Sequence, residues 1–363
     1  SKEEEIQIII HHWIRTLNIQ LGWIKDFDKL VVDYASTAFM FDTFRSSSKL
    51  INEFTGHTSY VWSIDYSTFD DCLFICSGSN DRTVRVCDVD NNKQIQSFNK
   101  HLSDVHCVKF SSYHRQNIIF SSSGDKTIRF WNFKHNMQLQ IFNEHTDGVC
   151  GIEFSPFNGG RYLCSGSYDK TIRLWDVETS KLLHIFNGHE KGILCVDISP
   201  LQSNNNNGNK KKMNNIAKQF NVFKGHISYV QSVKYGLNEF VNTILSRSDD
   251  KSVRLWDIRS GEQIQVFNGH KYEVWSVEYS PFVIKNSIGN SNVICSGSWD
   301  NTIRFWDIRS NKKELYMIKG NEEEDRMLCL KFIALKKKKD SKNVTYDLNL
   351  CYGSVKGPIR IWG

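Results

Sequence analysis

The sequence predicts an all-β protein made of seven consecutive units, each with four short strands. Three observations carry this prediction. Histidines recur at a fixed interval, a characteristic stretch of residues recurs behind them, and apolar residues alternate with polar ones inside every regular unit. Self-similarity with a period of about 20–50 residues is typical of repeat proteins, in which each unit buries its apolar face against its neighbours. We therefore expect one repeated architecture.

The histidines give the period of the repeat. His57, His101, His145 and His189 stand 44 residues apart, and the same interval separates His226 from His270. Only 37 residues separate His189 from His226, and a last unit follows near Glu323, where no histidine stands. The seven predicted units begin near residues 57, 101, 145, 189, 226, 270 and 323.

Within a regular unit the hydrophobic period is two. The third unit reads HTDGVCGIEF, RYLCSGS, KTIRLWD and KLLHIF, with a turn or polar loop after each run. Such alternation between turn signals predicts four β-strands. The fourth unit departs, because the chain runs from ILCVDISP into LQSNNNNGNKKKMNN and resumes at KQFNVF. We expect residues 202–215 to be disordered, and either a two-stranded fourth unit or a ring that adapts to six.

The motifs at the unit ends carry a resemblance to a known family. Gly-His opens units at residues 56–57, 188–189, 225–226 and 269–270, and Trp-Asp closes units at residues 175–176, 256–257 and 306–307. With these motifs residues 46–363 resemble the WD-repeat (WD40) β-propeller family. The resemblance implies a seven-bladed propeller with a degenerate fourth blade, acting as a non-catalytic scaffold for protein or peptide partners. Cys87–Asp88, Trp131–Asn132 and Trp362–Gly363 are relaxed endings.

The two chain ends are expected to close the ring. The sequence stops at IRIWG, which is the third strand of the last unit, while residues Lys49–Phe54 form a strand without a unit of their own. Pairing of these two strands removes exposed sheet edges, which otherwise invite aggregation.

Each regular unit contains a histidine, a serine and an aspartate in an order that suggests a hydrolase triad. A nucleophilic triad needs one copy in one cleft with an oxyanion hole, so five copies at fixed spacing favour a structural network and no enzyme. The aspartate can accept from the imidazole, the imidazole can contact the serine, and a following tryptophan can donate its indole N–H. The predicted network consists of His57, Ser77 and Asp81; His101, Ser121, Asp125 and Trp131; His145, Ser165, Asp169 and Trp175; His226, Ser246, Asp250 and Trp256; and His270, Ser296, Asp300 and Trp306.

Composition excludes several other functions. The ten cysteines include no C-x-x-C pair, and histidines of different units should lie far apart, so neither a metal site nor a cofactor is expected. A net charge of +6 is too mild to require nucleic acid, and the lysine runs at 210–212 and 336–339 read as solvated loops. The sequence has no long apolar run and no signal-like start, so we expect a cytoplasmic protein without a membrane segment.

Residues 1–45 are predicted to form a helical segment ahead of the propeller. Ile6, Ile9, Ile10, Trp13 and Leu17 share one helical face, and a second apolar stripe follows after Gly22. Two interpretations stay open. In the first, the two predicted helices pack on the propeller or on each other. In the second, they serve as a dimerisation or docking hairpin. The oligomeric state is left open.

The predicted partner site lies where the Gly-His loops and the aspartate turns gather on one rim of the ring. Positions three and five beyond the histidine and the position before the turn aspartate point to that rim. Aromatic residues at such positions are typical of binding hot spots, and Asp104, Asp249 and Glu273 nearby favour a basic partner segment. The aromatic residues are Tyr60, Trp62, Tyr168, Tyr229, Trp275 and Trp299.

A second functional hypothesis concerns ubiquitin ligases. Ile244–Arg259 and Ile294–Arg309 both end in Trp-Asp-Ile-Arg and resemble the adaptor-docking box of substrate receptors of cullin-RING ligases. Arg259 and Arg309 would then dock the adaptor. Arg247 and Cys295 depart from the small and aliphatic positions of that box.

Overall fold

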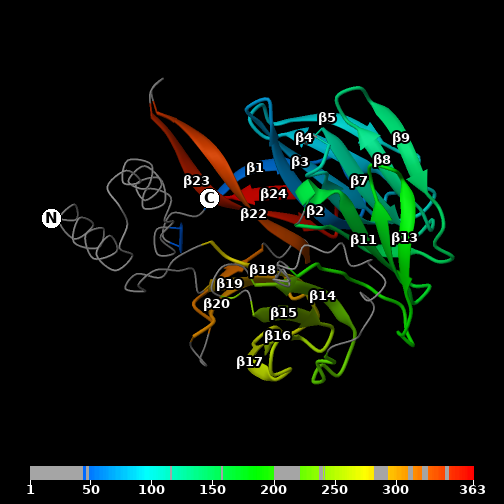
Figure 1. Cartoon of the computed structure of the whole chain (residues 1–363). Helices are drawn as coiled ribbons and strands as arrows, with labels where there is room; N and C mark the ends of the chain where they lie inside the picture. The colour runs from blue at the N-terminus through cyan, green and yellow to red at the C-terminus, as the bar shows by residue number, and fades with distance from the viewer. Residues whose placement is uncertain are drawn as a thin grey trace, which may run out of the picture.

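The computed structural model describes residues 44–45, 49–114, 117–156, 158–199, 221–236, 240, 242–281, 293–309, 314–320, 326–339 and 343–363. Within these residues the chain forms six antiparallel sheets of four strands each. The first strands of consecutive sheets contact one another, from β2 to β6 to β10 and from β14 to β18 to β22, and β22 contacts β2 again. The sheets are therefore the blades of a ring (Figure 1).

The first three blades follow the chain in order. The first blade consists of β2 (Val61–Phe69), β3 (Cys72–Ser79), β4 (Val84–Asp88) and β5 (Lys93–Phe98). The second consists of β6 (Val105–Phe110), β7 (Ile118–Ser123), β8 (Ile128–Asn132) and β9 (Met137–Phe142). The third consists of β10 (Val149–Phe154), β11 (Tyr162–Ser167), β12 (Ile172–Asp176) and β13 (Lys181–Phe186), with a 3-10 turn at Asn158–Gly160.

The remaining blades include the junction of the two chain ends. The fourth blade consists of β14 (Val230–Tyr235), β15 (Thr243–Ser248), β16 (Ser252–Asp257) and β17 (Gln263–Asn268). The fifth consists of β18 (Val274–Tyr279), β19 (Val293–Ser298), β20 (Thr302–Asp307) and β21 (Tyr316–Lys319). The sixth consists of β22 (Met327–Lys339), β23 (Asn343–Ser354), β24 (Ile359–Trp362) and β1 (Leu50–Phe54).

The predicted closure of the ring is confirmed. β1 pairs antiparallel with β24, with Phe54 opposite Ile359. Lys49 and Gly363 exchange two backbone hydrogen bonds of 3.1 Å, and Arg360 binds Glu53 at 3.0 Å. Figure 1 shows the blue first strand lying beside the red last strand. One strand from the N-terminal side thus completes the blade that the C-terminus leaves open.

The hydrophobic core lies between the blades. One cluster joins Phe120 and Phe130 of the second blade to Ile152 and Leu163 of the third. The indole of Trp175 stacks on Phe142, the last residue of the preceding outer strand, at a ring distance of 4.5 Å. Each blade therefore needs its neighbour to bury its apolar face, as the period-two pattern predicts.

The prediction of a seven-bladed propeller is wrong in its number of blades. The described residues form an all-β ring of six blades. The predicted fourth unit contributes no strand in its described parts, 189–199 and 221–226, because it lacks the residues of two middle strands. The predicted helical segment 1–45 lies outside the described residues except for Phe44 and Arg45, and so does the stretch 202–215. The domain limits 1–45 and 46–363 stay a prediction.

Among the described residues, the segment 193–199 of the degenerate unit contacts both the third and the fourth blade. The N–H of Ile193 donates to the carbonyl of Ser167 at 2.9 Å, and the carboxylate of Asp197 accepts the N–H of Tyr235 at 2.8 Å. A Cβ added to Gly166 would stand 2.7 Å from Ile193, so only glycine permits this close approach. In the described part of the chain, this segment thus lies between the third and fourth sheets.

Candidate functional site

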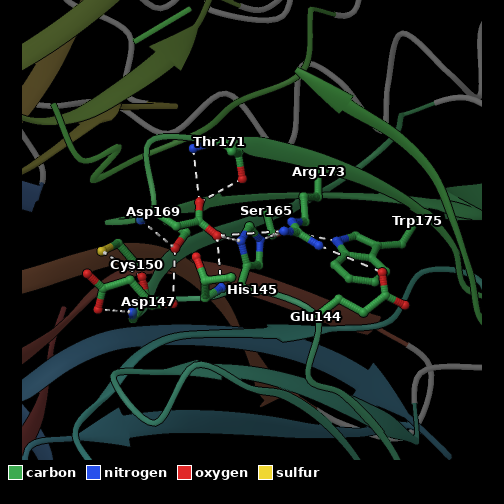
Figure 2. A network of polar contacts seen from close by, with 12 residues as sticks. Glu144, His145, Asp147, Cys150, Ser165, Asp169, Thr171, Arg173 and Trp175 are labelled. Atoms are coloured by element: carbon green, nitrogen blue, oxygen red, sulfur yellow. Dashed lines mark hydrogen bonds and ion pairs between the residues drawn. The ribbon is translucent and has the colours of Figure 1, made fainter. Parts of the chain in front are cut away.

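The histidine, serine and aspartate of the third blade come together in one buried chain of hydrogen bonds (Figure 2). His145 Nδ1 lies 2.7 Å from Asp169 Oδ2, and His145 Nε2 lies 2.8 Å from Ser165 Oγ. Trp175 Nε1 donates to the same Ser165 Oγ at 2.8 Å. Because an ionised carboxylate only accepts, Nδ1 carries the proton, and Nε2 of the neutral ring accepts from the serine hydroxyl.

The charges of this network follow from its burial. Burial lowers the pKa of His145 below its ordinary value even though Asp169 works in the opposite direction, so the ring is neutral at pH 7. Burial alone would raise the pKa of Asp169, but hydrogen bonds from Thr171 and His145 outweigh it and hold that pKa well below the usual range. A neutral imidazole and a charged carboxylate are therefore locked together.

The same arrangement recurs in four other blades. The histidine-to-aspartate and histidine-to-serine distances lie between 2.7 and 3.0 Å at His57, His101, His226 and His270. Tryptophan N–H groups complete it in the second, fourth and fifth blades at 2.7–2.8 Å, from Trp131, Trp256 and Trp306. The first blade has Cys87 in place of the tryptophan.

In the four blades that have the tryptophan, this arrangement leaves no position for a substrate. Ser121, Ser165 and Ser296 are fully buried, and each hydroxyl already contacts an imidazole and an indole. A nucleophile needs an open approach for the reacting carbon and donors for the developing oxyanion. The network therefore acts as a lock within each blade.

One set of residues in the lock was missed by the sequence analysis. A hydroxyl two residues beyond each turn aspartate donates to its second carboxylate oxygen, as Thr171 does to Asp169 at 2.6 Å. Equivalent bonds come from Thr83, Thr127, Ser252 and Thr302. The signal was present, because threonine or serine recurs at that spacing in the sequence.

The six predicted partner-binding residues, Tyr60, Trp62, Tyr168, Tyr229, Trp275 and Trp299, gather around one cavity, and we call them the aromatic mouth. Trp62, Tyr168, Tyr229 and Trp275 line a cavity of ≈ 660 Å³. Tyr60 and Trp299 adjoin it through ring contacts: Tyr60 to Trp62 at 5.3 Å, and Trp299 to Trp275 at 5.7 Å. Trp62 and Trp275 contact each other at 5.5 Å.

The cavity lies at the end of the central channel. Its lining includes the second residue of the innermost strand in every blade, together with Leu194 from the linking segment. These strand residues are Trp62, His106, Cys150, Gln231, Trp275 and Leu328. Any ligand that enters the cavity therefore touches several blades at once.

Two tryptophans of the aromatic mouth have unused hydrogen-bonding capacity. Trp62 Nε1 and Trp275 Nε1 are buried and have no hydrogen-bond partner among the described residues. A buried donor without a partner costs about 1–3 kcal/mol. If either indole rotated to donate its N–H to a carbonyl of a binding partner, it would therefore break no existing hydrogen bond.

The cavity lining is mostly positively charged, whereas the sequence analysis expects a basic partner. Lys170, Lys191 and Arg247 line the cavity against one carboxylate, Glu190. Burial lowers the pKa of Arg247 to about 10, and its Nε has no hydrogen-bond partner among the described residues. The lining therefore favours a negatively charged group. Sequence reasoning missed Arg247 as a lining residue, although it visibly replaces glycine in the Ser-Gly-Ser stretch.

The predicted acidic neighbours lie beside the cavity and outside its lining. Asp249 accepts two hydrogen bonds of 3.0 Å from Gln231. Arg326 lies over the ring of Trp299 at 4.4 Å from its centre, which adds another positive charge at the aromatic mouth.

The channel wall below the aromatic mouth carries paired charges. They occupy the fifth position of the innermost strands, where Lys109 pairs with Glu153 at 2.5 Å. Glu278 accepts from Lys234 at 3.3 Å and from Lys331 at 3.4 Å. Attraction between opposite charges on neighbouring blades holds the innermost strands in register.

The two arginines of the ligase hypothesis lie away from the aromatic mouth. Arg259 and Arg309 are exposed and follow the ends of β16 and β20, opposite the strand ends that carry the turn aspartates. The backbone N–H of Arg259 donates to Asp257 at 2.8 Å, and the Arg309 guanidinium lies 3.5 Å from Asp307. The structure thus separates them from the aromatic mouth. No helix in the described ranges is long and apolar enough to cross a membrane.

Comparison with known sequences adds the family. The sequence model of WD40, described as WD domain, G-beta repeat, matches residues 48–88, 92–132, 136–176, 180–204, 217–257 and 261–307. These segments cover more than half of the chain. The computationally designed Ika8 protein is similar in fold, with a TM-score of 0.57 at 19% identity over 86% of this chain and 99% of that one.

Three curated relatives match over short stretches. Transcription initiation factor TFIID subunit 5 of Caenorhabditis elegans is 42% identical over 53 residues, which are 14% of this chain and 8% of that protein. A probable E3 ubiquitin ligase complex SCF subunit sconB of Arthroderma benhamiae is 38% identical over 60 residues, 16% and 9% of the two chains. E3 ubiquitin-protein ligase COP1 of Arabidopsis thaliana is 36% identical over 61 residues, 17% and 9%. The matches thus span less than a tenth of each relative.

Proposed function

Because the chain belongs to the WD40 family (WD domain, G-beta repeat), whose propellers are generally non-catalytic, we propose that it is a scaffold that binds a protein or peptide at the aromatic mouth. The observation that carries this proposal is the set of six aromatic residues that line or adjoin the ≈ 660 Å³ cavity, four of them joined by ring contacts. A cavity of this size is typical of sites that take a side chain or a small ligand.

The exposure of the tyrosines supports a docking role. Tyr168 and Tyr229 are 46% and 59% exposed, although both stand at the edge of a cavity. Large aromatic groups at the centre of an interface supply most of its binding energy when a partner desolvates them, about 2 kcal/mol or more each. They line the same cavity as the partly buried Trp62 and Trp275, so one partner segment could contact all four rings.

The charge of the lining refines the partner. Arg247, Lys170 and Lys191 line the cavity with one carboxylate, Glu190, while Asp249 and Glu278 act on the Arg247 charge from outside the lining. A buried guanidinium gains most from a carboxylate, which can accept two of its N–H groups. We therefore propose a partner segment with an acidic side chain next to an apolar anchor.

The test compares two double variants that remove side chains of similar exposure. Tyr168→Ala with Tyr229→Ala removes the exposed part of the aromatic mouth. The control, Met137→Ala with Leu139→Ala on the outer strand β9, removes side chains that are 54% and 51% exposed. Partners captured by the wild-type chain are measured by titration against each purified variant.

We expect the tyrosine variant to bind at least about tenfold more weakly, which corresponds to about 1.4 kcal/mol, and the control to bind as the wild type does. Circular dichroism and the thermal midpoint establish that both variants fold. Equal affinity of the tyrosine variant and the wild type would move the site away from the aromatic mouth.

Two observations favour a second function. Two relatives bear names of ubiquitin-ligase components, and Arg259 and Arg309 are both exposed beyond a Trp-Asp pair. In this alternative the chain is a substrate receptor of a cullin-RING ubiquitin ligase, with the substrate at the aromatic mouth and the adaptor at the arginines. Arg259→Glu with Arg309→Glu should abolish co-purification of the adaptor and leave binding at the aromatic mouth unchanged. If the adaptor never co-purifies with the wild-type chain, this function is excluded.

A further inference from the structure

A pocket lies in the first blade, the regular blade in which Cys87 stands in place of the tryptophan. It has a volume of ≈ 220 Å³ and lies at the seam where the first blade meets the closing sixth blade. Its lining includes Phe54, Gly56, His57, Ser77 and Cys87. None of these residues lines the cavity at the aromatic mouth.

The pocket occupies the place of a missing indole. The third blade puts Trp175 ten residues beyond Ser165, and the second, fourth and fifth blades do the same. The first blade has Cys87 ten residues beyond Ser77. A cysteine is much smaller than a tryptophan, so the space that the indole fills elsewhere stays open.

The hydrogen-bond partner of the missing indole is still present. Ser165 Oγ contacts His145 and also accepts the N–H of Trp175, whereas the structure gives Ser77 Oγ only its contact with His57 at 2.8 Å. Ser77 is 1% exposed. One acceptor position on its hydroxyl is therefore left without a donor among the described residues.

The stacking surface is also present. In the second and third blades the indole stacks on the last residue of the preceding outer strand, as Trp131 does on Phe98 at 4.7 Å. Phe54 ends the outer strand that precedes the first blade, and it is buried beside Cys87. It therefore offers the same face to a ring in the pocket.

Gly56, which precedes His57, also lines the pocket. A Cβ added to Gly225 or Gly269 would stand 2.8–2.9 Å from the indole of Trp256 or Trp306, so those positions need glycine. Gly56 occupies the same position in the first blade, where an added Cβ would meet the side chains of Gln94 and Arg85. The second and third blades have Lys100 and Glu144 there beside their tryptophans, so this glycine does not itself indicate an indole. Arg85, which also lines the pocket, has a buried Nε without a partner among the described residues.

We propose that this pocket binds a small planar heteroaromatic molecule of the indole class, with its N–H donated to Ser77 and its ring stacked on Phe54. A dry cavity of about 150 Å³ is large enough to bind benzene, so ≈ 220 Å³ has room for a two-ring molecule. Burial raises the pKa of the Cys87 thiol to about 12, so the thiol stays protonated and binding involves no covalent step.

Occupation of the pocket would stabilise the closure of the ring. Its walls come from Phe54 and Ile359 of the sixth blade and from Ser77 and Cys87 of the first. A ligand that binds only the closed ring raises the unfolding midpoint in proportion to the logarithm of its concentration. The stability of the seam between the first and sixth blades would thus depend on the concentration of a small molecule.

The test uses indole as the probe and the full chain as the receptor. Saturable binding is measured by ligand-observed NMR and by the thermal midpoint. Indole should bind the wild type and raise its midpoint, while 1-methylindole, which has the ring without the N–H, should bind at least about tenfold more weakly. Equal binding of the two compounds would overturn the assigned hydrogen bond to Ser77.

Two variants at one position distinguish the pocket from other surfaces. Cys87→Trp fills it with the chain's own indole, so indole binding should disappear and the midpoint without ligand should rise. Cys87→Ser, the matched control, keeps the space and should keep indole binding. The proposal is wrong if the wild type shows no saturable binding, or if Cys87→Trp binds indole as well as the wild type.

Discussion

Replacement of the network serine by alanine should destabilise the protein more in the third blade than in the first. Ser165→Ala in the third blade removes a hydroxyl that lies 2.8 Å from His145 Nε2 and 2.8 Å from Trp175 Nε1. Ser77→Ala in the first blade removes a hydroxyl bonded only to His57. Both serines are buried, at 0% and 1% exposure, so the two changes differ by one indole N–H.

The magnitude follows from the number of groups left without a partner. Each buried polar group that loses its partner costs about 1–3 kcal/mol. Ser165→Ala leaves two such groups and should lower the free energy of unfolding by about 2–6 kcal/mol. Ser77→Ala leaves one and should lower it by about 1–3 kcal/mol.

Urea unfolding of the two purified variants gives the comparison. The free energy is the product of the urea midpoint and the slope m, and equal slopes would show that both variants unfold from equally compact states. We expect the Ser165→Ala midpoint to lie clearly below that of Ser77→Ala. If the two substitutions cost the same, the indole does not contribute to the lock and the account of the blades is refuted.

Three further predictions concern pH, closure and the channel wall. Burial lowers the folded-state pKa of four network histidines, His57, His101, His145 and His226. Near and below the unfolded histidine pKa of about 6.5 the unfolded chain therefore binds more protons than the folded chain, and the urea midpoint should fall as the pH decreases from 7 to 5. A rise of the midpoint over this range would contradict the neutral imidazoles. Deletion of residues 1–54 should lower the thermal midpoint relative to deletion of residues 1–48, because only the longer deletion removes β1 from β24; equal midpoints would argue against closure. Glu278→Gln should lower the free energy of unfolding by about 1–3 kcal/mol, since Lys234 and Lys331 both lose a charged partner, and an unchanged urea midpoint would argue against these ion pairs.

Most of the fold could be predicted from the repeat in the sequence, and the degenerate unit shows where that prediction fails. The alternation of apolar residues and the constant spacing of histidine, serine and aspartate placed the regular blades and the closing strand. His189 kept the Gly-His motif, but the residues of two middle strands do not follow it, and the structure leaves His189 exposed. A motif at a unit's start therefore does not ensure that a sheet follows.

The candidate site was predictable only in part, for a physical reason. Aromatic positions follow from the repeat, because every blade presents the same strand positions to the rim. The basic lining does not, since Arg247, Lys170 and Lys191 come from different parts of the chain and converge only in the folded ring. The pocket beside Cys87 likewise needs the structure, although the cysteine is visible in the sequence as a departure from Trp-Asp.

Site-specific photo-crosslinking tests the central claim most directly. A photoreactive phenylalanine analogue replaces Tyr229 at the aromatic mouth in one variant and Met137 on β9 in the other, at exposures of 59% and 54%. We expect irradiation to attach a partner at position 229, to yield no such product at position 137, and to lose the product when Arg247→Glu removes the positive charge from the cavity. Attachment of the same partner at position 137 with none at position 229 would contradict the assignment of the aromatic mouth as the docking site.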